Sequence, residues 1–348
     1  MLRRANDIEV LATLQDGTEC LPEGKEGDIP QGNPKISVVG GHFPRQCIGG
    51  AGIMVPIDLT GHVALVTGVG DNHSFAWYIA KRLQEAGATI VLVCHPRVVN
   101  IVEGLLRSQH ADDVESRKLS NGQEFQPAKI FPCDVSYDTM DDVPPEVKND
   151  RRYARFSEYS IQGTVDAIGK EFGGIDILIH SIAFSREVTR PLLETSRKAY
   201  HEAMGISAYS LTSLVRAAVP YMSHRPSGAS VVGLTYVAAE RVVPHYGGGM
   251  ATCKAALQID AKQLAWFVGD RNIRVNLISA GPYGSRAARA INKDFDKLIQ
   301  HAAEHSPLRR PIKPQEVADG VLFLCSPLAS AITGQILYVD CGYNIMAT

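Results

Sequence analysis

The sequence predicts an α/β protein built on a doubly wound, parallel, seven-stranded sheet with helices on both faces. Short apolar runs rich in β-branched residues alternate with segments of helical periodicity, and no two runs are joined as a β-hairpin. Strands that alternate with helices form a parallel sheet covered on both sides. Right-handed crossovers then place ligands at the carboxyl ends of the strands. Polar and glycine-containing segments follow several of these runs, which indicates one site along that edge.

The first strand, HVALVT at 62–67, leads directly into a turn that contains Gly68 and Gly70, and a helical pattern follows. A strand, a glycine turn and a helix together direct backbone N–H groups and a helix N-terminus at a pyrophosphate. The third glycine of the dinucleotide-binding fingerprint is missing, so Ala76 or Ala80 must allow close contact between helix and strand. This is a Rossmann-like beginning, although glycine turns after strands are also common where no dinucleotide binds.

The other six strands follow in order along the chain, with helical segments between them. The strand segments are 88–95, 128–135, 174–183, 229–236, 272–282 and 334–342, and the helical segments include Thr164–Phe172, Lys198–Val219 and Met250–Val268. Asp134, at the end of the third strand, is placed to accept a hydrogen bond from an adenine amino group or, alternatively, to cap the strand end. Two long polar insertions, 96–127 and 136–160, are interpreted as solvated surface excursions.

Composition narrows the functional classes. The chain has 348 residues, 45% of them hydrophobic and 21% charged, and its net charge of −2 gives no reason to expect a nucleic acid or an anionic membrane as partner. No apolar run reaches the roughly 18 residues that a membrane-spanning helix needs. The seven cysteines are scattered without a CxxC pair, which is typical of reduced intracellular thiols and predicts neither a disulfide framework nor a metal site.

Residues 1–55 differ from the rest of the chain. They are rich in glycine and proline, and their first half is acidic. Neither a secretory signal nor a transit peptide is clear in them. We interpret 1–55 as a disordered leader or the remnant of a targeting segment, and 56–348 as a single domain.

The segment 235–254, TYVAAERVVPHYGGGMATCK, carries the residues that point to chemistry. A tyrosine close to a lysine can act as a general acid, because the ammonium lowers the pKa of the phenol, which then donates to a developing oxyanion. Lys254 follows Tyr246 by eight positions, which leaves the two roughly 80° out of register on a straight helix. The glycines at 247–249 could let the tyrosine end turn back. The alternatives are a half-buried strand-end tyrosine at Tyr236 and a solvated helix lysine at Lys254.

Taken together, these segments resemble the enoyl-acyl-carrier-protein reductases of type II fatty acid synthesis, within the short-chain dehydrogenase/reductase superfamily. The resemblance covers about 56–342 and is greatest to the plant and apicomplexan plastid branch. The matching strings are PIDLTGH, IDILIHSIA, RPLLETSRKAY, LTYVAAERVVPHYGGGM, KAAL, RVNLISAGPYGSRAARAI and SPLASAITGQILYVD. No tyrosine near the site is followed by a lysine four residues on, which separates this chain from ketoacyl and alcohol dehydrogenases of the same fold.

The resemblance implies a role for each site residue. Tyr246 would be the acid that meets the thioester carbonyl, Lys254 would hold the nicotinamide ribose and support Tyr246, and Tyr236 would line the acyl pocket. Substrate contacts would come from Ser185, Tyr236 and Tyr246. Cofactor contacts would come from Gly68, Ser74, Phe75, His95, Asp134, Val135, Ser181, Ile182, Ala183, Lys254, Tyr283, Gly284, Ser285, Arg286 and Ala287. No metal is expected.

Some residues depart from the family pattern. Ser74-Phe75-Ala76 stands in place of Gly-Tyr-Gly, His95 in place of a tryptophan near the adenosine, and Tyr283 in place of a leucine. Arg97, just beyond the second strand, could meet a 2′-phosphate. We expect NADH as cofactor on family grounds, and Arg97 leaves NADPH possible.

By resemblance, the substrate is an enoyl group carried on acyl carrier protein, the enzyme is a homotetramer, and the compartment is a plastid, either an apicoplast or a chloroplast. The residues alone show no clear targeting signal and would otherwise suggest the cytoplasm. Two alternatives stay open: a relative that reduces a different carbonyl or enoyl substrate, and a catalytically silent relative that only binds nucleotide or partners.

Overall fold

The computed structural model describes residues 57–223, 225–244, 246–285, 288–289 and 295–347. The predicted leader at 1–55 and two predicted cofactor residues, Arg286 and Ala287, lie outside these ranges.

A seven-stranded sheet forms the centre of the domain, and every pairing in it is parallel, as predicted. The strands are β1 (Val63–Thr67), β2 (Thr89–Cys94), β3 (Lys129–Pro132), β4 (Ile177–His180), β5 (Ala229–Thr235), β6 (Ile273–Ala280) and β7 (Ile336–Val339). Their order across the sheet is β3-β2-β1-β4-β5-β6-β7. Strands β1 to β3 are added toward one edge of the sheet and β4 to β7 toward the other, so the order of strands reverses between β1 and β4. Doubly wound sheets bind ligands at this point.

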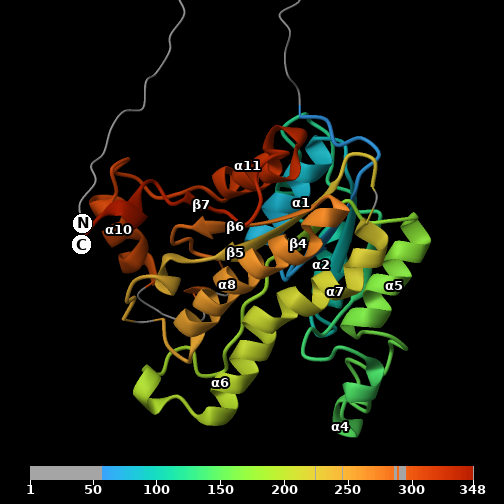
Figure 1. Ribbon diagram of the computed structural model, residues 1–348, viewed down its shortest axis with the longest axis horizontal. Coiled ribbons are helices and arrows are strands. Elements are labelled where there is room, and N and C mark those ends of the chain that lie inside the picture. Colours follow the sequence, from blue (N-terminus) through green and yellow to red (C-terminus); the bar gives the residue numbers. More distant parts are fainter. Residues whose placement is uncertain (1–56, 224, 245, 286–287, 290–294, 348) are drawn as a thin grey trace, which may run out of the picture. The chain divides into compact units, whose positions relative to one another are not determined.

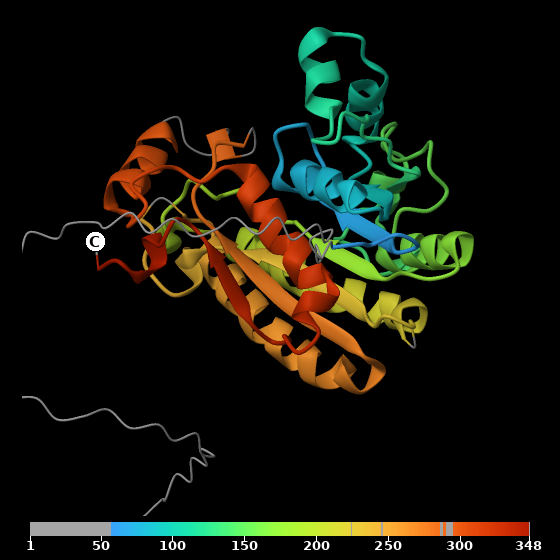
Figure 2. The ribbon, with the colours of Figure 1, turned by 90° about the horizontal axis from the view of Figure 1, so that it is seen from above.

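Helices cover both faces of the sheet (Figures 1 and 2). The helices are α1 (Phe75–Glu85), α2 (Val99–Arg107), α3 (Ala111–Arg117), α4 (Pro145–Lys148), α5 (Ile161–Phe172), α6 (Arg197–Met204), α7 (Ser210–Met222), α8 (Met250–Val268), α10 (Phe295–His305) and α11 (Pro314–Cys325). Apolar side chains of α1, α2 and α11 form the core on one face, and those of α5, α7 and α8 form the core on the other. Strands buried on both faces explain why the strand segments are apolar without alternation.

We had expected the two insertions, 96–127 and 136–160, to be solvated surface excursions. In the structure each of them contains buried apolar side chains. The first contains α2 and α3, and its Phe125 side chain packs edge-on against Trp77 of α1 with ring centroids 4.9 Å apart. The second builds a small core of its own from Val143, Tyr153 and Tyr159. Large apolar side chains within polar stretches fold each insertion back onto the domain.

A π-helical turn, Gly205–Tyr209, interrupts the single helix predicted over 198–219. The wider turn brings Ser207 toward the loop that follows β4, where its hydroxyl donates to the carbonyl oxygen of Phe184 (2.9 Å) and accepts from the Phe184 N–H (2.9 Å). π-Turns inside helices frequently occur at functional sites.

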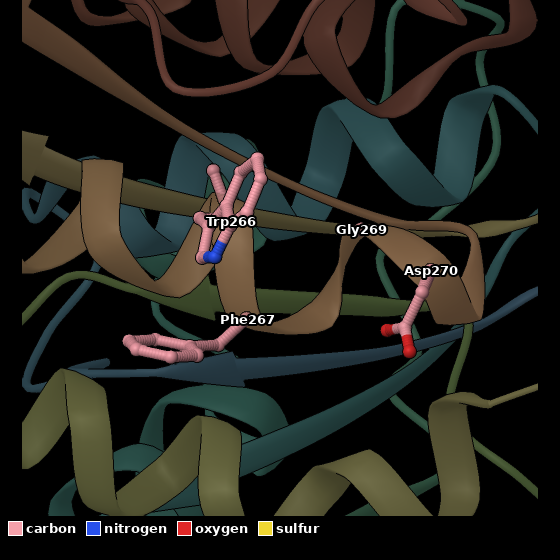
Figure 3. Close-up of a pocket in the computed structure, with 5 residues that line it drawn as sticks. Trp266, Phe267, Gly269 and Asp270 are labelled. Carbon is pink, nitrogen blue, oxygen red and sulfur yellow. The ribbon is translucent and has the colours of Figure 1, made fainter.

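The last turn of α8 carries two large apolar side chains to the surface. Trp266 is 83% exposed and Phe267 is 67% exposed, and they border an open hollow together with Gly269 and Asp270 (Figure 3). In the ranges that the structure describes, no helix is both long and apolar enough to cross a membrane.

Candidate active site

A cavity of about 330 Å³ opens at the carboxyl ends of β1, β4, β5 and β6. Eleven residues proposed from the sequence line it: Gly68, Ser74, Phe75, Ser181, Ile182, Ala183, Tyr236, Tyr246, Lys254, Tyr283 and Ser285. The structure therefore brings together residues more than 200 positions apart in the chain, at the edge where this fold places its ligands.

Gly68 joins the ends of β1 and β4. Its φ of +80° is unfavourable for residues with a side chain, and a Cβ at this position would collide with the carbonyl oxygen of Ser181. Beside it, the Thr67 hydroxyl donates to the Ile179 carbonyl (2.8 Å) and accepts from the Ser181 N–H (3.3 Å). The floor of the cleft is thus a close backbone contact that only glycine permits.

Helix α1 begins at the cleft. Ser74 caps it by accepting from the Trp77 N–H (3.3 Å), and Ala76 and Ala80 are fully buried. This confirms that alanines provide the close approach usually made by a third glycine. The Phe75 ring packs against Tyr283 with centroids 5.0 Å apart, so two residues that depart from the family pattern contact each other in the cavity wall.

The three glycines place Tyr246 outside helix α8, which begins at Met250. Gly248 and Gly249 have φ angles of +59° and +79°, so the chain turns back as the sequence suggested and the misfit in helical register does not arise. The rings of Tyr236 and Tyr246 then meet edge to face, with centroids 5.3 Å apart. Both tyrosines and Lys254 face the same cavity.

Lys254 is 5% exposed, so the alternative of a solvated helix lysine is wrong. Its Nζ donates to the carbonyl oxygen of Leu234 at the end of β5 (2.7 Å). Burial lowers the pKa of this ammonium to about 8. A buried lysine whose pKa lies close to neutrality is typical of functional sites.

The expected lowering of a phenol pKa by Lys254 is not found. Burial raises the pKa of Tyr246, and proximity to Tyr236 raises it further. Burial likewise raises the pKa of Tyr236, whose hydroxyl is buried without a hydrogen-bond partner in the described part of the chain. Both phenols therefore keep their protons at neutral pH, as donors to a carbonyl oxygen must.

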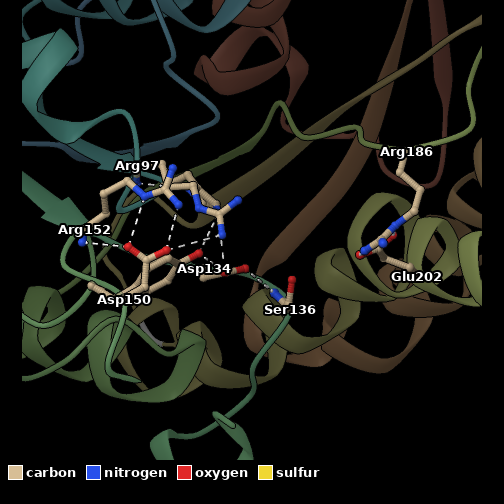
Figure 4. Close-up of polar contacts among 9 residues, drawn as sticks. Arg97, Asp134, Ser136, Asp150, Arg152, Arg186 and Glu202 are labelled. Carbon is tan, nitrogen blue, oxygen red and sulfur yellow. Dashed lines mark hydrogen bonds and ion pairs between the residues drawn. The ribbon is translucent and has the colours of Figure 1, made fainter. Parts of the chain in front are cut away.

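The predicted adenosine contacts form a second polar group, outside the cavity wall, at the ends of β2 and β3 (Figure 4). Asp134 is 6% exposed and accepts from the Tyr153 hydroxyl (2.7 Å) and the Ser136 N–H (3.0 Å). His95 Nε2 lies 3.3 Å from the same carboxylate and 3.1 Å from the Tyr153 hydroxyl. Burial alone would raise the pKa of Asp134, but His95, Tyr153 and Ser136 together hold it well below the usual range. Asp134 thus does cap the strand end, and its contact with adenine stays a prediction.

Ser185, predicted to contact substrate, does not line the cavity. Its buried hydroxyl donates to the Gly248 carbonyl (2.8 Å) and so fixes the glycine turn that carries Tyr246. Gly284 and Val135 also lie outside the cavity wall. Arg289 donates to the Gly284 carbonyl (3.0 Å) and forms an ion pair with Asp296 of α10 (2.7 Å).

Several wall residues were not predicted. They are Leu234, Thr235, Val243, Ala280, Ala288, Phe295 and Leu298. Gly281 and Pro282, at the end of the predicted strand segment 272–282, also line the cavity. Phe295 and Leu298 come from α10, where an apolar residue at helical spacing gives no sign of whether it faces core or ligand. Within the described ranges, no three His, Cys, Asp or Glu side chains are grouped as metal ligands would be.

Comparison with known proteins gives consistent matches. A family model described as enoyl-(acyl carrier protein) reductase matches residues 156–344. The chloroplastic NADH enoyl-acyl-carrier-protein reductase 1 of Oryza sativa subsp. japonica is 46% identical over 293 residues, which cover 84% of this chain and 76% of the rice protein. The chloroplastic counterpart of Arabidopsis thaliana is 45% identical over 293 residues, covering 84% of this chain and 74% of that protein.

Solved structures agree with the sequences. The enoyl-acyl-carrier-protein reductase of Plasmodium berghei, solved with triclosan, has a TM-score of 0.77 and 39% identity, and the match covers 82% of this chain and 98% of that one. The reductase of Anaplasma phagocytophilum, solved in complex with NAD, has a TM-score of 0.67 and 31% identity, with coverage of 83% and 96%.

Proposed function

The chain belongs to the enoyl-acyl-carrier-protein reductase family, and we propose that it reduces the trans-2 double bond of enoyl thioesters with Tyr246 as the hydrogen-bond donor to the thioester carbonyl and Lys254 as its positioning partner. The reaction is the last step of the fatty acid elongation cycle. The observation that carries the residue roles is the convergence of two protonated tyrosines and a buried lysine on one mainly apolar cavity.

The residues present fit a nicotinamide dinucleotide. The cavity borders the glycine turn and the first residues of α1, and the buried Tyr236 hydroxyl has no hydrogen-bond partner among the residues that the structure describes. Gly68, Ser74, Ser181 and Ile182 would hold the nicotinamide half, and His95 and Asp134 the adenosine. The named relatives are NADH enzymes, and we propose NADH for this chain. Bound NADH would supply the hydride for the β-carbon of the enoyl thioester.

Tyr246 would then donate to the thioester carbonyl oxygen. Negative charge develops on that oxygen as the double bond is reduced, and a preorganised donor in a water-poor cavity stabilises it strongly. Because its pKa is raised, the phenol acts as a hydrogen-bond donor that retains its proton. The enolate that forms on hydride addition then takes up a solvent proton at its α-carbon, which completes the reduction. Tyr236, edge-on to Tyr246, would keep the ring in place and line the acyl pocket.

Lys254 would act from the floor of the cavity. Its bond to the Leu234 carbonyl fixes the ammonium, and two of its three protons are left to contact the ribose hydroxyls. The positive charge of Lys254 stabilises the negative charge that develops on the thioester oxygen more than it stabilises the neutral ground state. This differential stabilisation speeds the chemical step.

The test is oxidation of NADH by the full chain with a short trans-2-enoyl thioester, with a β-ketoacyl thioester in parallel. We expect turnover of the enoyl compound alone. Turnover of the ketoacyl compound alone would make the protein a ketoreductase. Cofactor binding without turnover of either compound would favour a silent relative.

A different enoyl or carbonyl substrate is the second candidate, and one observation favours it. Tyr283, which stands in place of a leucine, adds aromatic bulk to the cavity wall, where its ring packs against Phe75. Comparison of enoyl chain lengths in the same assay decides it, because a narrowed cavity would reject long chains that an enzyme of fatty acid elongation must accept.

Assembly, partner and compartment are proposals that rest on the family. Trp266 and Phe267 expose two adjacent large apolar side chains at the end of α8, which an interface between subunits would cover. We propose a homotetramer by family, to be checked by light scattering against the 37.7 kDa chain. We propose that acyl carrier protein delivers the substrate. Arg310 offers little to an acidic carrier, because it is already paired with Glu316 (2.6 Å). The chloroplastic relatives support a plastid location.

A further inference from the structure

Arg97, which could meet a 2′-phosphate, lies outside the cavity wall. It lies three residues beyond the end of β2, with half of its side chain exposed. In dinucleotide-binding folds this is where the adenosine ribose lies, and an arginine there accommodates the 2′-phosphate of NADPH. Arg97 by itself therefore predicts NADPH, whereas the rice and Arabidopsis relatives are NADH enzymes.

The structure places a carboxylate beside this arginine (Figure 4). Asp150 Oδ2 lies 3.9 Å from Arg97 Nη2. The same aspartate accepts from Arg152 through Nη2 (2.7 Å), Nε (3.1 Å) and the backbone N–H (2.9 Å). Asp150 comes from the 136–160 insertion and not from the strand end, so motif spacing gives no indication of it.

The insertion is fixed in this position by one buried contact and by contacts at the surface. The buried hydroxyl of Tyr153 donates to Asp134 (2.7 Å), and the half-exposed Arg97 guanidinium lies 5.6 Å from the centre of the Tyr153 ring. Near the start of the insertion, Asp138 accepts at the surface from the hydroxyl of Tyr209 (2.8 Å) and from Arg216 (2.8 Å). Asp150 is thus held next to Arg97 by the fold.

The charges at this end cancel. Arg97 and Arg152 carry two positive charges, and Asp134 and Asp150 carry two negative ones. Hydrogen bonds and charge from Arg152 hold the pKa of Asp150 well below its usual range, and that of Asp134 is also low, so both aspartates stay ionised at neutral pH. A 2′-phosphate, with nearly two negative charges, meets no net positive charge from these four groups. The binding of a neutral 2′-hydroxyl does not depend on that net charge.

We propose that Asp150, carried by the 136–160 insertion, neutralises Arg97 and so makes the adenosine end select a ribose 2′-hydroxyl over a 2′-phosphate. The proposal rests on the proposed function in one respect, that the ligand is a nicotinamide dinucleotide. It assigns cofactor choice to a residue outside the strand-end motif.

The test uses two nucleotides that differ only at the 2′ position, adenosine 5′-monophosphate and adenosine 2′,5′-bisphosphate, titrated calorimetrically into the full chain. We expect the wild-type protein to bind the monophosphate more tightly. Asp150→Asn keeps an acceptor for the Arg152 N–H and removes one negative charge. It should bind the bisphosphate about tenfold more tightly than wild type, with the monophosphate changed by less than about twofold, as expected for one exposed charge at close range.

Two further variants separate this effect from general damage. Arg97→Gln should weaken the bisphosphate about fivefold relative to wild type, and the double variant Arg97→Gln with Asp150→Asn should lose the gain. Glu202→Gln, which removes the carboxylate of the exposed Arg186–Glu202 ion pair on α6, is the matched control and should change neither affinity.

An unchanged preference in Asp150→Asn, or a gain that survives the loss of Arg97, would overturn the proposal, as would a wild-type protein that binds neither nucleotide. Enoyl turnover, measured on the same samples, tests the proposed function separately. A protein that shifts its nucleotide preference as expected but reduces no enoyl thioester keeps this inference and loses the reaction.

Discussion

The two ends of the cleft use polar groups in opposite ways. At the adenosine end, Asp134, Tyr153 and His95 contact one another. At the catalytic end, the buried Tyr236 hydroxyl has no partner among the described residues, and the pKa of Lys254 is lowered to about 8 by burial. Buried polar groups without partners destabilise a fold. Among those found in the described residues, the Tyr236 hydroxyl belongs to a residue that lines the cavity, which is a sign of function.

The difference shows which end is complete before ligands arrive. The adenosine end resembles a structural hydrogen-bond network, and we propose that it serves binding. The catalytic end holds a donor and a cation in an unfavourable setting, where bound reactants would provide the missing partners. Natural proteins break the rules of local consistency mainly at such sites. The variants below test whether the two ends differ in this way.

Lys254→Met should have the largest effect. We expect kcat/KM to fall by about a thousandfold, comparable to the loss of one preorganised electrostatic group, while the protein becomes more stable at pH 7. A lysine pKa lowered from 10.5 to about 8 corresponds to roughly 3 kcal/mol against the charged form in the folded state, and the lost bond to Leu234 offsets about 1 kcal/mol of that. Thermal unfolding should show a Tm about 2–5 °C higher.

The sign of this stability effect can be checked through pH. Between about pH 8 and 10.5, wild-type Lys254 loses its proton in the folded state but keeps it in the unfolded state, so wild-type stability rises with pH. The advantage of Lys254→Met should therefore shrink by pH 10. A variant that is less stable than wild type at pH 7 would contradict the account.

The pH dependence of the wild-type enzyme should show the next largest effect. If the ammonium of Lys254 is required, kcat/KM should decline above about pH 8 and approach a tenfold loss per pH unit. In Lys254→Arg the cation is permanent, so the decline near pH 8 should disappear from whatever activity remains. A wild-type profile that is flat to pH 10 would remove the lysine from the mechanism.

Tyr153→Phe should have the smallest effect and a different character. The variant leaves Asp134 without one of its donors but touches no part of the cavity wall. We expect KM for NADH to rise about fivefold with kcat within about twofold of wild type, because only binding is weakened. Steady-state kinetics with NADH varied at saturating enoyl thioester would measure this, and a large fall in kcat would show that the two ends are not separate.

Sequence patterns predicted the fold more completely than the site. Strand periodicity predicted all seven strands, and the glycine turn at Gly68 predicted the cleft, because both depend on local backbone chemistry. The turn at 247–249 also predicted that Tyr246 would leave the helical register. These are short-range properties, and a sequence displays them directly.

What the sequence could not predict depends on long-range folding. Asp150 and Tyr153 reach the adenosine end only because the 136–160 insertion folds back through its own small core. Phe295 reaches the cavity because α10 lies beside it. The pKa of Tyr246 moved in the opposite direction from the expected one, because burial raises it and proximity to Tyr236 raises it further. Contacts and burial of this kind are set by the tertiary structure.

The most direct test of the central claim is a single-turnover measurement of NADH oxidation with a trans-2-enoyl thioester in Tyr246→Phe and Tyr236→Phe, together with their NADH dissociation constants. The account predicts that Tyr246→Phe oxidises NADH about a hundred to ten thousand times more slowly than wild type, while Tyr236→Phe loses less than about tenfold and both bind NADH normally. Hydride transfer at the wild-type rate in Tyr246→Phe would contradict it.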